Sequence, residues 1–199
     1  MAGLRELHKE KRRHAICASA IKLFAAYGYE RTTVSSIAAD ANVSPATVFN
    51  YFKTKSDILL EAIDAADQLA FVEIGNNRSN WHDPVQALVE LDRFITLFEC
   101  NVLPVNVWRE VLPSWIIAPP TQLIALNEKI INLTTDVLTT LRDEELIKPE
   151  ADISFTANFL NSYASARFWK EIQNGDFCID NHVEHMTLAI TMLINGIRA

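Results

Sequence analysis

Two helix starts close together in the sequence limit how residues 33–52, TVSSIAADANVSPATVFNYF, can fold. Thr33 offers the hydroxyl acceptor that is preferred at a helix N-cap, and Ser44 is followed by Pro45, which loses no hydrogen bond at the first position of a helix. Each start is followed by apolar residues at helical spacing. The segment therefore predicts two short amphipathic helices that pack at a steep angle, which is a helix-turn-helix.

The rest of the chain has the pattern of an all-α protein. Its sequence holds only 5 glycines and 7 prolines, and sparse helix breakers favour long helices over many short strands. We expect no strand and about nine helices, with a polar loop over residues 75–82 and a proline-rich connection at Pro113, Pro119 and Pro120. The expected helices cover residues 5–27, 33–42, 44–51, 55–74, 83–100, 104–112, 121–146, 149–174 and 180–199.

Charge is divided unevenly along the chain. The formal net charge is −7, which by itself argues against binding to nucleic acid. Residues 1–55, however, hold nine basic and four acidic residues, a net charge of +5, whereas the remainder holds nine basic and 21 acidic residues, a net charge of −12. A basic head on an acidic body is expected if only the head meets phosphate, although a solvated, helix-forming N-terminus has the same composition.

The exposed face of the second short helix carries short polar or aromatic side chains and no acidic one. These candidates for base contacts are Ser44, Ala46, Thr47, Asn50 and Tyr51. Asparagine can make a paired contact to adenine, and a threonine methyl can contact thymine in the major groove. The flanking candidates for phosphate contacts are Thr33, Ser35, Lys53 and Lys55. A structural hairpin with no partner is the alternative, and the flanking bases argue against it.

Residues 11–59 contain a series of short motifs, almost without gaps. They are Ala20-x-x-Leu23-Phe24, Gly28-Tyr29, Thr32-Thr33-Val34, Ile37-Ala38, Val43-Ser44, Thr47-x-Phe49-x-Tyr51-Phe52 and Lys53-x-Lys55. Together they resemble the N-terminal domain of the tetracycline-repressor (TetR) family. Phe49 departs from the family, which often has tyrosine there, so we do not count Phe49 as a DNA contact. Asn50 occupies a position that varies in the family, which makes it a candidate for operator choice.

The resemblance implies a homodimer that binds a palindromic operator and leaves it when a small-molecule effector binds. We therefore expect a TetR-type helix-turn-helix DNA-binding domain over residues 10–70, with three helices and the motif at 33–52. A helical effector-binding and dimerisation domain is expected over residues 75–199. No motif is recognisable in this second domain, so its helices are interpreted from their apolar pattern.

The helix expected over residues 149–174 is apolar on two sides. Phe155, Phe159 and Tyr163 lie on one stripe, and a second stripe on nearly the opposite side contains Leu160 and Phe168. One stripe is expected in the core of the domain and the other against a second protomer. The residues expected at the dimer interface are Leu160, Ala164, Phe168, Met186, Ile190, Leu193 and Ile197. Burial of both stripes within one protomer is the alternative.

An effector pocket is expected between the fifth and eighth helices, although aromatic residues at helical spacing are usually only core. The candidates for its lining are Phe94, Phe98, Trp108, Arg109, Trp115, Phe159 and Tyr163. Their composition favours an apolar or aromatic effector, with one anionic group that Arg93 or Arg109 could bind. His182 and His185 share a helix face, but no third ligand is evident, so we expect a solvated helix N-terminus there, and neither a metal site nor a cofactor.

The sequence contains none of the common nucleophile, phosphate-binding or metalloprotease motifs, so we do not expect an enzyme. Three scattered cysteines, a charged N-terminus and the lack of a run of about 20 apolar residues favour a cytoplasmic protein. The expected function is that of a sequence-specific, DNA-binding transcriptional regulator, a repressor released by a small molecule. One alternative is a DNA-binding protein of the same fold that answers to a protein partner or to no ligand. Another is a helical scaffold whose basic face is incidental.

Overall fold

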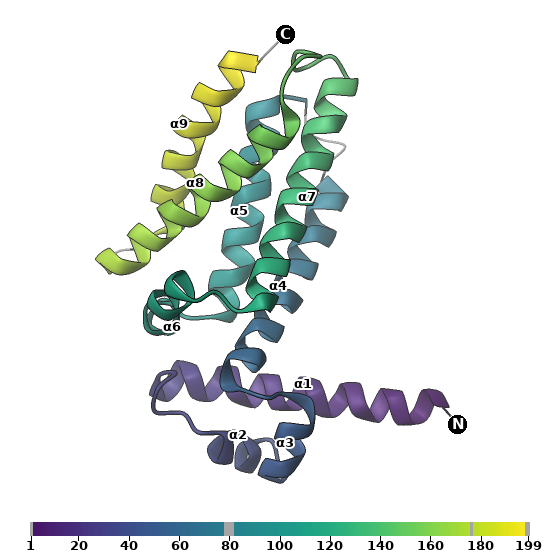
Figure 1. Ribbon diagram of the computed structural model, residues 1–199, viewed down its shortest axis with the longest axis vertical. Helices are drawn as coiled ribbons and strands as arrows, with labels where there is room; N and C mark the ends of the chain where they lie inside the picture. The colour runs from purple at the N-terminus through teal and green to yellow at the C-terminus, as the bar shows by residue number, and fades with distance from the viewer. Residues whose placement is uncertain (1, 78–81, 176, 198–199) are drawn as a thin grey trace.

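The computed structural model describes residues 2–77, 82–175 and 177–197, and over these residues the chain forms nine α-helices and no strand (Figure 1). The all-α prediction is confirmed. The helices are α1 (Ala2–Tyr27), α2 (Val34–Asp40), α3 (Pro45–Tyr51), α4 (Lys55–Asn77), α5 (Pro84–Val102), α6 (Val105–Ile117), α7 (Thr121–Asp143), α8 (Ile153–Asn174) and α9 (Ile179–Ile197).

Both helix starts of the helix-turn-helix form as the sequence predicts. Thr33 Oγ1 accepts a hydrogen bond from the Ser36 backbone N at 3.1 Å, and Ser36 Oγ accepts one from Thr33 N at 3.0 Å. The Ser44 hydroxyl accepts from Thr47 N at 3.0 Å, and Pro45 occupies the first position of α3. These contacts satisfy N–H groups that a helix leaves unpaired at its start, which fixes where α2 and α3 begin.

The helices form two parts: a small head, made of α1, α2 and α3, lies at one end of a longer helical body (Figure 1). In the head, α1 crosses beneath the body, and α2 and α3 lie on the side of α1 that faces away from the body. The long helix α4 runs without a break from the head into the body, where it joins α5, α7, α8 and α9 in a bundle. The short helix α6 lies at the junction of the two parts.

The apolar core of the head continues into α6. Phe24, Ile37 and Val48 are buried in the head, and the same cluster extends to Trp108 and Val111 of α6. A second cluster fills the bundle between α4, α5, α7, α8 and α9. Burial of each large apolar side chain is worth roughly 1.5–3 kcal/mol. A continuous apolar core therefore joins the head to α6.

One predicted helix end is wrong because a proline lies inside the helix. We expected Pro113 to belong to a connection, but α6 runs through it to Ile117. A proline within a helix leaves the carbonyl four residues earlier without its donor. Here both Pro113 and Arg109, whose carbonyl is concerned, are exposed, so water can replace the missing donor.

Other helix boundaries shift because a different residue provides the cap. We expected Pro149 to start α8, but the helix begins at Ile153, where Asp152 accepts a hydrogen bond from the backbone N of Phe155 at 2.9 Å. Asp180 lies in the first turn of α9 and does not cap it. Helix α4 continues to residue 77, into the expected loop, of which residues 78–81 lie outside the described part of the chain. None of the described helices is long and apolar enough to cross a membrane.

Candidate DNA-binding face and effector cavity

Helix α3 turns one face towards the head core and another towards solvent. Val48 is buried, whereas Ala46 and Asn50 are exposed. Thr47 is half-buried, and its Oγ1 lies 2.8 Å from Ser44 Oγ, so the two hydroxyls share a hydrogen bond. The exposed face thus offers an amide, a methyl group and two linked hydroxyls, all of them able to contact base edges or phosphate.

Two aromatic residues of α3 lie differently from our expectation. Tyr51 was expected on the exposed face, but it is half-buried against the head core. Phe49, which we excluded, is 55% exposed and follows Ala46 by one helical turn. The missed signal was its position: it shares the face of Ala46 and Asn50 whether or not it carries a hydroxyl.

The flanking polar residues are not equally available to DNA. Ser35 and Lys53 are exposed, and no contact with another side chain occupies the Lys53 ammonium within the described chain. The Thr33 hydroxyl is exposed, but it already caps α2. Lys55 donates through Nζ to the backbone carbonyls of Tyr29 and Thr32, at 2.8 and 2.9 Å. Its ammonium therefore holds the turn before α2 against the start of α4.

A carboxylate of α6 contacts the turn between α1 and α2. Glu110 Oε2 accepts a hydrogen bond from the backbone N of Glu30 at 2.9 Å. Gly28 has a positive φ of 86°, and a Cβ at this position would come within 2.7 Å of Glu110 Oε1. The positive φ favours glycine, and a side chain at this position would also displace the Glu110 carboxylate. The glycine therefore serves both the turn and the contact between head and body.

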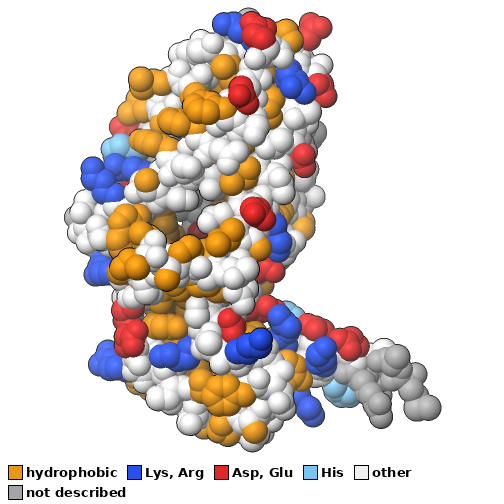
Figure 2. Space-filling model, viewed as in Figure 1, with side chains coloured by type: hydrophobic (Ala, Val, Ile, Leu, Met, Phe, Trp, Pro, Cys, Tyr) orange, Lys and Arg blue, Asp and Glu red, His pale blue; other side chains and the backbone are white. Residues whose placement is uncertain are grey.

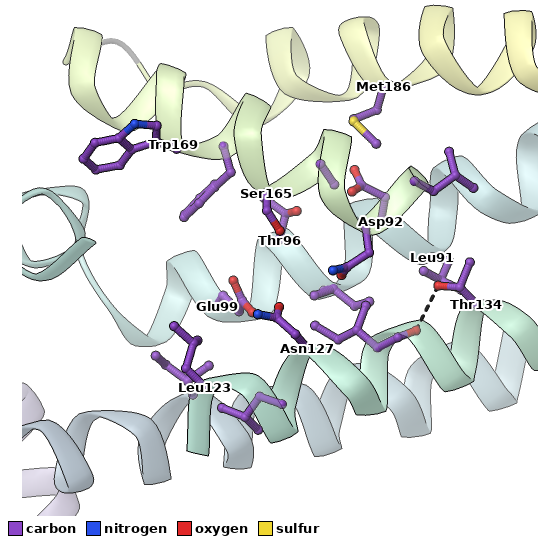
Figure 3. A pocket seen from close by; sticks show the side chains of 18 of the residues that line it. Leu91, Asp92, Thr96, Glu99, Leu123, Asn127, Thr134, Ser165, Trp169 and Met186 are labelled. Atoms are coloured by element: carbon purple, nitrogen blue, oxygen red, sulfur yellow. Dashed lines mark hydrogen bonds between the residues drawn. The ribbon is translucent and has the colours of Figure 1, made fainter. Parts of the chain in front are cut away.

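The body contains a cavity of about 410 Å³. Figure 2 shows the surface hollowed above α6, and Figure 3 shows side chains of α5, α7, α8 and α9 pointing into the space. Its walls are mostly apolar, and three tryptophans, Trp108, Trp115 and Trp169, line it. The volume and the apolar lining are those of a small-molecule site in a protein.

The polar residues of the cavity come from three helices. Asp92, Thr96 and Glu99 lie on α5, at successive turns of one helix stripe. From the opposite walls, the side chain of Asn127 on α7 points towards Glu99, and that of Ser165 on α8 points towards Thr96 (Figure 3). Few polar groups in an apolar cavity are the arrangement that orients a bound ligand.

Comparison with known proteins identifies the head. The family model for bacterial regulatory proteins of the tetR family matches residues 16–62, which cover the C-terminal part of α1, the helix-turn-helix and the start of α4. The head is a DNA-binding domain of the tetR family. The HTH-type transcriptional regulator TcmR of Streptomyces glaucescens is 37% identical to it over 86 residues, which are 43% of this chain and 38% of that protein. The matched segments span less than two fifths of the length of the curated relatives.

Solved structures of TetR-family regulators share the fold of the chain beyond the head. A putative TetR-family regulator from Syntrophomonas wolfei aligns with a TM-score of 0.74 at 17% identity, over 94% of this chain and 96% of that one. FadR of Thermus thermophilus, solved in complex with lauroyl-CoA, aligns with a TM-score of 0.70 at 20% identity, over 90% and 93% of the two chains. At this identity the likeness concerns the fold, including the arrangement of the body.

The cavity of this protein contains only part of the predicted lining. Trp108 and Trp115 line it as expected, and the others of the predicted set do not. Phe94 and Phe98 pack against the bundle core from outside the cavity. Phe159 is exposed and stacks between Phe155 and Tyr163 on the outer side of α8. Aromatic spacing alone does not tell which side of a helix the cavity occupies.

The prediction that an arginine serves the cavity is wrong. Arg93 pairs with Glu90 at 3.4 Å, and Arg109 Nε donates to the carbonyl of Ile172 at 3.2 Å, both away from the described lining. The acids that do line the cavity, Asp92 and Glu99, were not among our candidates. Their signal was available, because they lie seven residues apart on the apolar stripe of α5.

The half-buried Glu99 lies beside a buried acid, Asp67 of α4. The side chains of Asp67 and Glu99 interact with each other, and two adjacent carboxyl groups repel unless one of them carries a proton. Burial raises the pKa of Asp67 to about 7. Burial, and then the charge of Asp67, raise the pKa of Glu99 well above its usual value. No other donor within the described chain reaches either carboxylate oxygen of Asp67.

We predicted that His182 lies at a solvated helix start, but this prediction is wrong, because His182 is fully buried. Its Nδ1 lies 2.7 Å from Glu171 Oε2, and its Nε2 lies 3.2 Å from Asp92 Oδ2. Arg167 donates to Glu171 at 2.5 Å and lies 3.0 Å from His185 Nδ1. Burial lowers the pKa of His182, but the carboxylates of Asp92 and Glu171 outweigh burial and raise it overall.

The two apolar stripes of α8 lie opposite to our expectation. The stripe that we assigned to the dimer interface faces the interior of the protomer, and the other stripe is exposed. Leu160 of the predicted interface is 6% exposed, and Met186 and Ile190 are also buried within the protomer. Ala164 and Phe168 line the cavity, and Leu193 and Ile197 pack at the edge of the bundle core. The exposed apolar residues of α8 and α9 are Phe155, Phe159, Leu188 and Met192. Figure 2 shows apolar side chains gathered on the surface over these two helices.

Proposed function

We propose that this TetR-family protein is a transcriptional repressor that binds a palindromic DNA operator and is released when a small molecule occupies the cavity. The observation that carries this proposal is that the same helices connect the DNA-binding head to the cavity in the body. Helices α4 and α6 belong to the core beneath the exposed face of α3 and also contribute residues to the cavity wall. A protein of this function works where operator DNA is, so we place it in the cytoplasm and propose no catalytic role.

The exposed face of α3 enters the major groove in this proposal. Asn50 is placed to make a paired contact with adenine, and Thr47 and Ala46 offer methyl groups to thymine. Phe49 adds an exposed apolar surface of the same kind. Lys53 contacts a phosphate, which positions the helix without distinguishing sequences. The net charge of +5 over residues 1–55 supports this use of the head.

A second copy of the chain covers the exposed apolar face of α8 and α9. Phe155 and Leu188 are each 61% exposed, and Met192 is 79% exposed, so the isolated protomer leaves a contiguous apolar surface in water. Packing two such faces across a two-fold axis buries them and presents two heads to one DNA duplex. Half-sites are then expected about 34–36 Å apart, or at a multiple of that distance.

Helix α6 provides a route from the cavity to the head. Trp108 and Trp115 of α6 line the cavity, while Glu110 between them accepts from the backbone of the α1–α2 turn. A ligand that displaces α6 therefore moves a contact of the DNA-binding head. Release follows only to the extent that the ligand binds the released conformation more tightly than the DNA-bound one.

The cavity favours the proposed sensor over a protein of the same fold that is controlled by a protein partner or by no ligand. A body without a ligand would be expected to be packed without a large void, because interiors are close-packed. A volume of about 410 Å³ with polar groups from three helices supports the sensor.

Selection of operators from genomic DNA fragments tests the proposal. The full-length protein is incubated with fragments at near-physiological salt, where non-specific binding is weak. We expect recovery of one palindromic site whose half-sites match the spacing of a dimer. Recovery of fragments without a common sequence, in a preparation whose circular dichroism shows the folded helical protein, would refute the regulator and favour the scaffold.

A further inference from the structure

The proposed effector cavity contains acids and no base. Within its described lining, the only titratable side chains are Asp92 and Glu99. The remaining polar residues are neutral, and neither lysine, arginine nor histidine is among them. An acidic group in an apolar site repels an anionic ligand and attracts a cationic one, and the low dielectric constant of the site strengthens both effects.

The two acids are not equally available to a ligand. Asp92 lies 3.2 Å from His182 of α9, which partly compensates its charge. Glu99 has no basic partner within the described chain, and its neighbour is the acid Asp67. In the ligand-free protein the pair Asp67–Glu99 therefore holds a proton, because two adjacent buried carboxylates would repel each other. Glu99 is the member of the pair that borders the cavity (Figure 3).

The walls around the acids are aromatic. Trp108, Trp115, Phe168 and Trp169 line the cavity, and the ring of Trp108 meets those of Trp115 and Phe168 edge-on. The faces of such rings carry negative charge density and attract cations, with tryptophan the strongest. The indole N–H of Trp108 is buried without a partner, so a ligand that also carries an acceptor would satisfy it.

We propose that the cavity binds an apolar organic cation, an amine whose ammonium group pairs with Glu99 while its apolar body packs against the tryptophans. This inference rests on the proposed function, because it names the chemical class of the effector. When the ammonium pairs with the Glu99 carboxylate, the proton held between Glu99 and Asp67 is released to solvent. The charge of the cation replaces that of the proton, so the net charge of the site does not change on binding.

The proton released on binding makes the affinity depend on pH. The groups that face the pair are Asp64 of α4, Asp92 of α5 and Lys129 of α7, and from α9 His182 reaches it only through Asp92. A raised pKa keeps the pair protonated at neutral pH. By linkage, binding that expels a proton strengthens as pH rises. We expect amine affinity to increase between about pH 6 and pH 8, because the pKa of Asp67 is raised to about 7.

A set of three matched probes tests the ligand class. They are a naphthylpropylamine, the naphthylpropanol of the same skeleton and the carboxylate of the same length. Binding to the full-length protein is measured by titration calorimetry and by quenching of tryptophan fluorescence, since three of the four tryptophans line the cavity. We expect the amine to bind on the order of tenfold more tightly than the other two. Preference for the carboxylate, equal affinities or no binding of the amine would overturn the proposal.

Substitution of single acids tests the residues. Glu99→Gln should remove the preference for the amine and leave the affinity for the alcohol unchanged. Glu90→Gln on the same helix, outside the cavity, is the matched control and should change neither. Asp67→Asn should keep amine binding but reduce proton release, because one of the causes that raise the pKa of Glu99 is removed; calorimetry in two buffers of different ionisation enthalpy measures the release. Thermal melting verifies that each variant is folded. Unchanged amine preference in folded Glu99→Gln would contradict the assignment.

The outcome for the ligand class is separable from that of the proposed function. A protein that selects an operator but prefers the carboxylate remains a regulator and loses its cationic effector. A protein that prefers the amine but selects no operator keeps its cation site and loses the role in transcription.

Discussion

Two lysines two residues apart differ in what their ammonium groups can contact. Lys53 is exposed, whereas Lys55 donates to two carbonyls of the turn 29–32 and lies 4.4 Å from the centre of the Tyr29 ring. We placed both among the phosphate candidates because sequence shows only their charge and their distance from the helix-turn-helix. The structure indicates that Lys55 supports the shape of the head, while Lys53 is free to meet DNA.

The two lysines therefore should respond differently to removal. Lys55→Ala is expected to lower the free energy of unfolding by about 1–2 kcal/mol, because the turn carbonyls lose a charged donor. Lys53→Ala should leave stability within about 0.5 kcal/mol. It should also flatten the slope of log binding constant against log salt by about one for each head. Chemical denaturation and DNA titrations at several salt concentrations measure the two effects. Equal stability of the variants would contradict the structural role of Lys55.

Asn50 is the residue at which we expect DNA sequence to be read. Asn50→Ala should reduce discrimination between operator and random DNA by about 1–3 kcal/mol, because a paired base contact is lost. Affinity for random DNA should change little, since phosphate contacts remain. Competition binding with both DNAs measures the ratio. Equal losses on operator and random DNA would show that Asn50 does not read a base.

At the level of elements, α8 separates the cavity from the proposed dimer face. Leu160 and Ala164 line the cavity, and Phe155 and Phe159 lie on the outer side of the same helix. Helix α9 is divided in the same way, with Met186 and Ile190 inward. The effector site and the subunit contact therefore share two helices, and a ligand that moves α8 also moves the interface.

A charge on the outer face of α9 should separate the protomers. Met192→Glu is expected to raise the dimer dissociation constant by roughly 30-fold or more, because it places a carboxylate in a surface that is otherwise apolar. Val72→Glu on α4 is the matched control, since Val72 is also an exposed apolar residue but lies outside α8 and α9. Sedimentation equilibrium compares the variants. Dissociation by Val72→Glu but not by Met192→Glu would place the interface elsewhere.

For the molecule as a whole, three buried groups link stability to pH in the same direction. The pKa values of Asp67, Glu99 and His182 are all raised in the folded protein. A group with a raised pKa contributes stability below its unfolded pKa and loses that contribution as pH rises through the folded value. The free energy of unfolding therefore falls from about pH 4 upwards, because Asp67 and Glu99 resist ionisation in the folded protein. It falls further from about pH 6.5, because the stabilising contribution of protonated His182 is then lost as well.

Replacement of one buried acid should reduce this dependence. Asp67→Asn is expected to raise the free energy of unfolding at pH 8 by on the order of 2 kcal/mol, because no buried carboxylate then has to ionise at this position. At pH 4, where Asp67 is protonated in the folded protein, the gain should nearly vanish. Urea denaturation of both proteins over this range measures the difference. A gain that does not change with pH would show that repacking, not ionisation, is its cause.

Local signals predicted most of the head. The hydroxyl of Thr33 and the pair Ser44-Pro45 act through contacts within four residues, so their caps form wherever the segment lies. The alternation of buried and exposed positions on α3 follows from the same helical spacing, and Phe49 was missed only because we required a hydroxyl there. Pro113 was misplaced because the exposure that makes a proline tolerable within a helix depends on the surrounding fold.

The sequence by itself determined the helices, the uneven charge and the family of the head, because these depend on neighbours along the chain. Only the tertiary structure decided which stripe of α8 faces the cavity, and that Asp67 and Glu99 meet from different helices. It also decided that His182 is buried between two carboxylates. These facts depend on the rotation of each helix against residues distant in sequence. A stripe pattern shows that a helix has two apolar sides, but it does not show what packs against either.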